Sequence, residues 1–128
     1  MHEEPSAEEL IEAVKSFITE TAAPQLTGHS AFHARVAVNA LDIALRDMTS
    51  RATDEAYERS ALQNLLDDNA DDLKALNEAL CQAIRSGKMN WRTPGLADFL
   101  TETAKRQMAI DQPRYSGYRA ALKLKPGS

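Results

Sequence analysis

A wide apolar arc runs through the segment Phe32-His33-Ala34-Arg35-Val36-Ala37-Val38-Asn39-Ala40-Leu41-Asp42-Ile43. On a helix that turns 100° per residue, the apolar side chains of residues 32–48 cover about two thirds of the circumference. A helix that is apolar over so much of its surface needs neighbours on several sides. We therefore expect a central helix over about residues 30–50, with these side chains in the core: Phe32, Val36, Ala40 and Ile43.

A narrow polar stripe interrupts this arc. Its members recur at i, i+4, i+7 and i+11: Arg35, Asn39, Asp42 and Arg46. In one interpretation the stripe is a solvated face with a weak Asp42–Arg46 pair. In the other, neighbouring helices enclose it, and its guanidinium and amide groups form a groove for a carboxylate or a phosphate.

His33 projects into the apolar arc rather than into the polar stripe. Burial disfavours the charged imidazolium, so we expect a buried, neutral, structural histidine. The alternative is an imidazole that binds a ligand, which would place His33 in the candidate site with Arg35 and Asn39.

Helical start signals and further apolar stripes flank this segment. Ser6 and Glu9 have the spacing of a capping box, and the apolar residues behind them share one helical face. Thr53 and Thr93-Pro94 are expected to begin later helices, and Ser86-Gly87 is expected to end one. Three stripes follow the central segment: Tyr57, Ala61, Leu62, Leu65 and Leu66; then Leu73, Leu76, Leu80, Ala83 and Ile84; then Leu96, Phe99, Leu100, Ala104, Met108 and Ile110.

No alternation of the kind that marks strands occurs anywhere in the chain. The sequence therefore predicts an all-α fold, a single-domain bundle of about five helices around the central helix. That domain spans residues 1–128, with flexible ends at about residues 1–5 and 123–128.

Composition and charge exclude several classes of function. Nineteen acidic against fifteen basic residues give a formal charge of −4, which argues against a nucleic-acid-binding protein. The apolar runs are too short to span a membrane, and the acidic start does not resemble a secretory signal. The single cysteine, Cys81, is expected to be a small buried side chain, and its lack of a disulfide partner fits a cytoplasmic protein.

Motifs that carry catalytic chemistry are missing from the sequence. It has no glycine-rich phosphate loop, no nucleophile elbow and no histidine pair with a third metal ligand nearby. We expect no catalytic residue, no cofactor and no metal site, which favours a protein that is not an enzyme.

The segment after Pro113 carries a second candidate site. It consists of two tyrosines three residues apart, flanked by arginines: Arg114, Tyr115, Tyr118 and Arg119. Tyrosine and arginine are enriched where protein interfaces are strongest, so this segment is a candidate interaction patch. The alternative is that the tyrosines fold back and cover the end of the bundle.

Three separated motifs carry a resemblance to a known family. They are Gly28…Ala31-Phe32-His33-Ala34-Arg35-Val36-Ala37…Asn39-Ala40-Leu41, then Leu76-Asn77…Leu80-Cys81…Ile84-Arg85…Gly87, and then Ile110-Asp111-Gln112-Pro113-Arg114-Tyr115. In this order they resemble a bacterial family of small helical domains of unknown function. Gln112 departs from that pattern, in which an asparagine precedes the proline. The resemblance implies the helical fold and an association with aminoglycoside-phosphotransferase-like kinases and acyl-CoA dehydrogenases, beside which such domains are encoded or to which they are fused.

Two hypotheses for function follow. The first is a non-catalytic accessory or interaction module that works beside a phosphotransferase-like kinase or an acyl-CoA-handling enzyme, with a homodimer as a further assembly. The second is a domain that binds a small anionic ligand, or a minor enzyme, and uses Arg35, Asn39 and His33. Exposure of the polar stripe favours the first hypothesis, whereas an enclosed stripe with an apolar floor favours the second.

Overall fold

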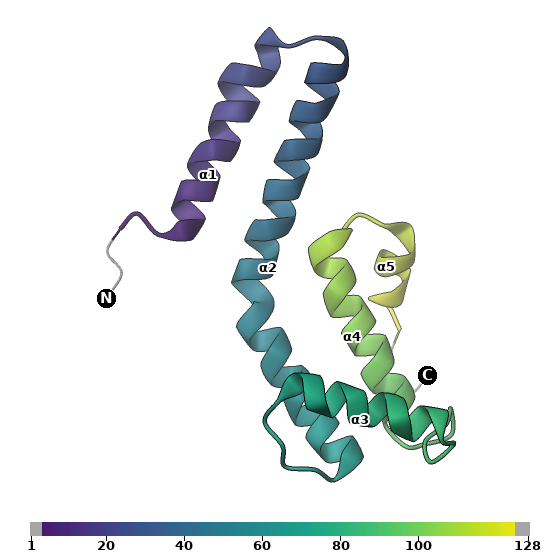
Figure 1. Ribbon diagram of the computed structural model, residues 1–128. Helices are drawn as coiled ribbons and strands as arrows, with labels where there is room; N and C mark the ends of the chain where they lie inside the picture. The colour runs from purple at the N-terminus through teal and green to yellow at the C-terminus, as the bar shows by residue number, and fades with distance from the viewer. Residues whose placement is uncertain (1–3, 125–128) are drawn as a thin grey trace. The chain divides into compact units, whose positions relative to one another are not determined.

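The structure is a computed structural model that describes residues 4–124. All regular structure in these residues is helical, which confirms the all-α class. The elements are α1 (Ala7–Phe17), a π-helical turn (Ile18–Ala22), a 3₁₀ turn (Ala23–Gln25), α2 (Gly28–Leu66), α3 (Leu73–Arg85), α4 (Leu96–Asp111) and α5 (Ser116–Ala121) (Figure 1). The ends that we expect to be flexible fall largely on residues 1–3 and 125–128, outside the described residues.

The longest element, α2, corrects the predicted helix boundaries. It is one continuous helix of 39 residues, so the expected end near residue 50 and the expected start at Thr53 are both wrong. No proline or glycine follows Gly28 within α2. The hydroxyls of Thr49 and Ser50, near the expected boundary, donate to the carbonyls four residues earlier, at 2.9 and 3.0 Å, as such side chains do inside a helix. The helix ends at Asp67, which has a positive φ of 51°.

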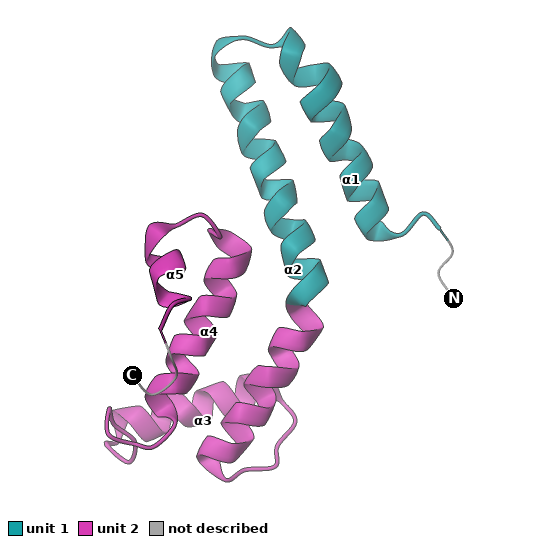
Figure 2. Ribbon diagram, turned by 180° about the vertical axis from the view of Figure 1, so that it is seen from behind, with its two compact units in different colours: residues 1–50 teal, residues 51–128 magenta. Residues whose placement is uncertain are grey.

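The contacts divide the chain into two compact units, residues 1–50 and 51–128, and the boundary falls inside α2 (Figure 2). We refer to them as unit 1 and unit 2. Each has its own packing and is described by itself.

Unit 1 is a helical hairpin of α1 and the first part of α2 (Figure 1). Ser6 caps α1, since its hydroxyl oxygen accepts a hydrogen bond from the Glu9 amide at 3.2 Å, as the capping box predicts. The Lys15 ammonium lies 2.6 Å from a carboxylate oxygen of Asp42 and joins the two helices. None of the described residues of unit 1 is buried.

This hairpin overturns the expected burial of the apolar arc. Phe32 and Val36 keep 53% and 49% of their surface exposed, Ala40 is exposed, and Ile43 is only half-buried. His33 is also exposed, and its ring meets the edge of the Phe32 ring at a centroid distance of 5.7 Å. Within unit 1 this part of α2 has only α1 beside it, and one neighbour cannot cover an arc so wide.

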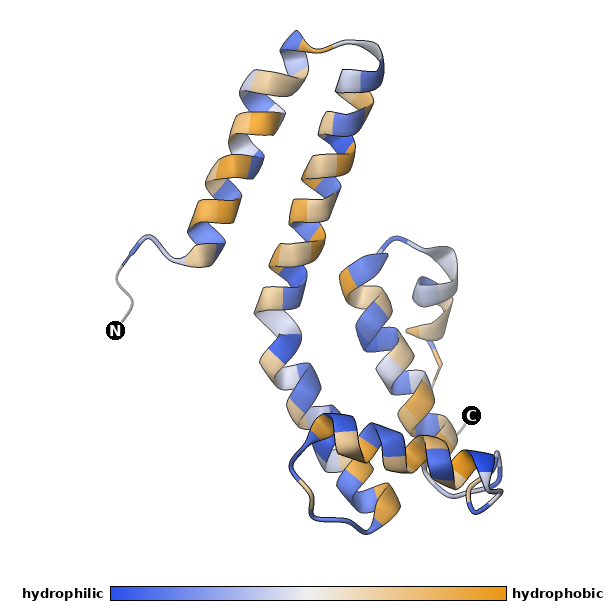
Figure 3. Ribbon diagram, in the orientation of Figure 1, coloured by the Kyte–Doolittle hydropathy of each residue, from blue (hydrophilic) through white to orange (hydrophobic). Residues whose placement is uncertain are grey.

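Unit 2 contains the hydrophobic core. The core residues come from α2, α3, the following loop and α4: Leu62, Leu76, Leu80, Ala83, Met89, Leu96 and Phe99. Leu62 and Leu76 are fully buried, and the Tyr57 ring stacks on Phe99 at a centroid distance of 6.4 Å. Apart from Met89, these residues belong to the apolar stripes found in the sequence after the central segment, whose orange bands are visible on α3 and α4 in Figure 3.

The start of α4 differs from the prediction. Thr93 does not cap the helix, because its hydroxyl oxygen accepts the amide of Asn90 at 2.9 Å and closes the preceding loop. Instead the helix begins after Gly95, whose φ of +86° is left-handed and favours glycine.

Replacing Gly95 by alanine should destabilise the protein by about 1–2 kcal/mol, because a left-handed backbone is unfavourable for a residue with a Cβ. The new Cβ would also lie 3.3 Å from Leu65 Cδ2, which must shift. Gly87→Ala is the matched control, because Gly87 has a similar φ of +79° but a Cβ at that position would have no atom within 4 Å. Urea unfolding should give a lower midpoint for Gly95→Ala than for Gly87→Ala; equal midpoints would show that the contact with Leu65 adds nothing.

Candidate functional site

The predicted polar stripe lies on α2 within unit 1. Arg35 and Asn39 are exposed, while Asp42 and Arg46 are half-buried. Asp42 is paired across the hairpin with Lys15, and this hydrogen bond raises the pKa of the Lys15 ammonium above its ordinary value. The Arg35 guanidinium lies 5.9 Å from the centre of the Phe32 ring. Half of the stripe therefore faces solvent, and Asp42 supports the hairpin.

His33, Arg35 and Asn39, the three residues of the ligand-binding hypothesis, are all exposed. The structure also has two open hollows whose lining residues are described, and both belong to unit 2. None of the three residues lines either of them. This exposure favours the interpretation of the stripe as a solvated face.

The larger hollow, of about 780 Å³, follows one face of α3 and is lined only by residues of that helix. Cys81 is one of them and is exposed, so the expected burial of this cysteine is wrong. The smaller hollow, of about 400 Å³, lies between α2 and the start of α4, where Tyr57, Leu65 and Gly95 line it. Both are open to solvent, unlike the enclosed pockets that bind most small molecules.

An ion cluster lies beside Tyr57 in unit 2. The Arg106 guanidinium contacts Asp54 at 2.7 Å and Glu102 at 3.1 Å, and it lies 4.3 Å from the centre of the Tyr57 ring. Burial lowers the pKa of Arg106, but the hydrogen bonds to Asp54 and Glu102 outweigh it and the pKa is raised. Burial raises the pKa of Tyr57, and the nearby Glu102 carboxylate raises it further. The cluster therefore joins α4 to α2 through one guanidinium that contacts two carboxylates.

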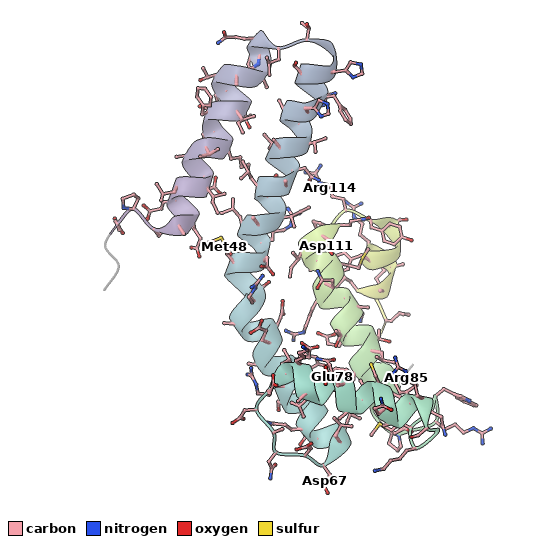
Figure 4. All side chains as sticks on the ribbon, viewed as in Figure 1. Met48, Asp67, Glu78, Arg85, Asp111 and Arg114 are labelled. Carbon is pink, nitrogen blue, oxygen red and sulfur yellow. The ribbon has the colours of Figure 1, made fainter. Side chains whose placement is uncertain are left out.

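The predicted interaction patch lies around α5. Tyr115 immediately precedes this helix and is exposed, as are Arg114 and Arg119, whereas Tyr118 is half-buried. Figure 4 shows Arg114 near Asp111, where α4 ends. The Tyr115 ring lies so close to Gly117 that a Cβ there would collide with it. Three of the four predicted residues are thus exposed, and Tyr118 is half-buried.

Sequence reasoning missed the most exposed large apolar side chain of the described residues. Trp91 keeps 78% of its surface exposed, in the connection between α3 and α4 that we call the Trp91 loop (residues 86–95). The Arg92 guanidinium stacks on its ring, 4.7 Å from the centroid. The signal available in the sequence was a lone tryptophan in a short connector with basic residues around it.

The Trp91 loop is held by its own hydrogen bonds. The amide of Met89 donates to the Ala83 carbonyl at 2.9 Å, and Met89 itself is buried in the core. The Asn90 side chain accepts the Arg92 amide at 2.8 Å, and the Thr93 amide donates to the Asn90 carbonyl at 2.9 Å. The loop therefore presents Trp91 from a fixed backbone.

The stretch of sequence around Trp91 is basic. Residues 79–97 contain Arg85, Lys88 and Arg92 but no acidic residue, although the whole chain carries a net charge of −4. Arg85 ends α3 (Figure 4), and the other two lie in the loop. An exposed indole that stacks with an arginine, in a stretch of chain with three basic and no acidic residues, is suited to an acidic protein surface.

Two other kinds of site are absent from the described part of the chain. Residues 4–124 contain no group of three or more His, Cys, Asp or Glu side chains placed to hold a metal ion. Across the same residues, no helix is both long enough and apolar enough to cross a bilayer.

The fold and these surfaces define a small all-α protein with exposed aromatic and apolar side chains. A family model matches residues 24–115, and its description is domain of unknown function DUF6285. Because the match covers most of the chain, the protein belongs to this family. Neither the curated proteins nor the solved structures gave a match.

Proposed function

We propose that this protein is a non-catalytic accessory module that docks onto a partner protein through the Trp91 loop. The partner is a phosphotransferase-like kinase or an acyl-CoA-handling enzyme, as the family resemblance implies, and the complex forms in the cytoplasm. One observation carries the proposal: Trp91 is 78% exposed on a loop whose backbone is fixed by hydrogen bonds.

The exposed indole is unfavourable in the free protein and favourable in a complex. Tryptophan and arginine are the residues most enriched among those that dominate binding energy, and here Arg92 stacks directly on Trp91. A fixed loop loses little conformational entropy on binding, so more of the contact energy contributes to affinity. The matching surface on the partner is an apolar recess for the indole with acidic residues at its rim.

The experiment begins with capture of the tagged full-length protein from its native host after cross-linking, and with identification of the bound protein. The affinity of that purified partner is then measured for the wild type and for Trp91→Ala. We expect Trp91→Ala to raise the Kd by about 30-fold or more, the loss typical of a dominant interface residue.

Tyr115→Ala is the matched control for that measurement, because Tyr115 is another exposed aromatic residue of unit 2. A loss of affinity confined to Tyr115→Ala would move the interface to the segment of residues 114–119. If a kinase or dehydrogenase binds and neither substitution weakens its binding, the role of the Trp91 loop is overturned. If the captured material contains neither enzyme class, the accessory role is overturned.

A further inference from the structure

The first helix of unit 1 carries an apolar stripe that nothing in the unit covers. Its large side chains recur at i, i+4 and i+7 and are 54%, 51% and 59% exposed: Leu10, Val14 and Phe17. We call this set the α1 stripe. It forms part of the orange banding along α1 in Figure 3.

The apolar face of α1 is wider than one neighbour can cover. Ile11 and Ile18 are half-buried, and Lys15 reaches Asp42 on α2, so this side of α1 meets its partner in the hairpin. At 100° per residue, Leu10 lies about 140° and Phe17 about 160° around the helix from Lys15. A helix in a four-helix bundle meets two neighbours, whereas the hairpin supplies only one.

The α1 stripe is free of charge, which suits contact with an identical surface. The glutamates of α1, namely Glu8, Glu9 and Glu12, lie about 120° or more from Val14 around the helix. Two-fold symmetry places residues near the axis opposite their own copies, so any charge there would meet a like charge. The stripe presents none, while a surface made for a charged partner would carry complementary charges.

The area is enough for a modest dimer. Since an aromatic side chain buries roughly 150–250 Å² when fully covered, Phe17 still offers on the order of 100 Å², and the three residues together offer on the order of 300 Å². Two copies would thus bury about 600 Å² of apolar surface, and because interfaces are only somewhat more than half apolar, the total is about 1,000 Å². This is near the lower end for specific interfaces, where weak or transient complexes lie.

We propose that the α1 stripe is the interface of a homodimer in which the two hairpins meet through α1. The two copies of α1 pack antiparallel about a two-fold axis near Val14, so that Leu10 of one copy meets Phe17 of the other. The stripe lies before the first residue matched by the family model, and the proposal therefore rests on the contacts of this chain alone. It uses unit 1, whereas the proposed function uses unit 2, and either can fail without the other.

Sedimentation equilibrium of the full chain tests the dimer. At about 100 μM the wild type should have about twice the mass of the 14.1 kDa chain, and Val14→Glu should have the mass of the monomer. Val36→Glu is the matched control, because Val36 is the same residue type with nearly the same exposure, on α2. The Val36→Glu variant should remain a dimer. A monomeric wild type would overturn the proposal. So would a dimer that Val36→Glu dissociates and Val14→Glu does not.

A cross-linking measurement covers the case in which Val14→Glu fails to fold, which circular dichroism would reveal. In a Cys81→Ser background, Val14→Cys places a thiol near the proposed axis, where it should form an intermolecular disulfide under mild oxidation within the concentration range of the dimer. Val36→Cys in the same background should form none above the level of random collision. Equal cross-linking of the two variants would show that the α1 stripe is not the interface.

Discussion

Replacing Phe99 by alanine should lower the free energy of unfolding by about 3–5 kcal/mol, the range for buried phenylalanine. Phe99 is 4% exposed and belongs to the core of unit 2, where its ring stacks on Tyr57. The substitution removes both the buried area and the aromatic contact that joins α4 to α2. Unfolding in urea, followed by circular dichroism, measures the loss; fluorescence of the exposed Trp91 would report it poorly.

Leu100→Ala is the control for Phe99→Ala, because Leu100 is the next residue of the same helix and is 48% exposed. It should cost about 1 kcal/mol or less. A midpoint for Phe99→Ala that stays close to the midpoint for Leu100→Ala would contradict the placement of α4 against the core.

Leu76→Ala should be the second large effect, with a loss of about 2–5 kcal/mol. Leu76 is fully buried on α3, and a smaller side chain leaves a cavity whose walls relax only in part. The same urea titration measures the loss. Ile84→Ala on the same helix, at a half-exposed site, should cost much less, and a result in the opposite order would mean that α3 presents a different face to the core.

The sequence predicted part of the local structure of unit 2. The stripe of Leu76, Leu80 and Ala83 became the buried face of α3, and Gly87 takes the left-handed conformation expected after the helix end. These features depend on residues within one or two helical turns of each other, so the periodicity of apolar residues in the sequence predicts them directly. The boundary inside α2 was predicted wrongly because Thr53 can either cap a helix or lie within one, and no proline or glycine ends the helix before it.

For the candidate sites, the sequence predicted which residue types lie together but not how exposed their side chains are. Tyr115 and Arg114 are exposed as an interaction patch requires, while Tyr118 is half-buried. Trp91 was not among the candidate site residues, and in the structure it is 78% exposed whereas Met89, two residues earlier, is buried. The packing of α3 and α4 decides which of these side chains is buried, so the residues of the loop do not determine it alone.

Val36 and Leu76 show that the sequence predicts a helical face, whereas the tertiary structure determines whether that face is buried. Both lie on regular apolar helical faces, and this periodicity determined that the chain is all-α. Leu76 is fully buried, whereas Val36 is 49% exposed. Periodicity states which side chains share a face, but burial depends on how many neighbours pack against that face, and this number follows from contacts between residues far apart in the chain. The tertiary structure alone therefore decided that the core forms in unit 2 and that no apolar residue described in unit 1 is fully buried.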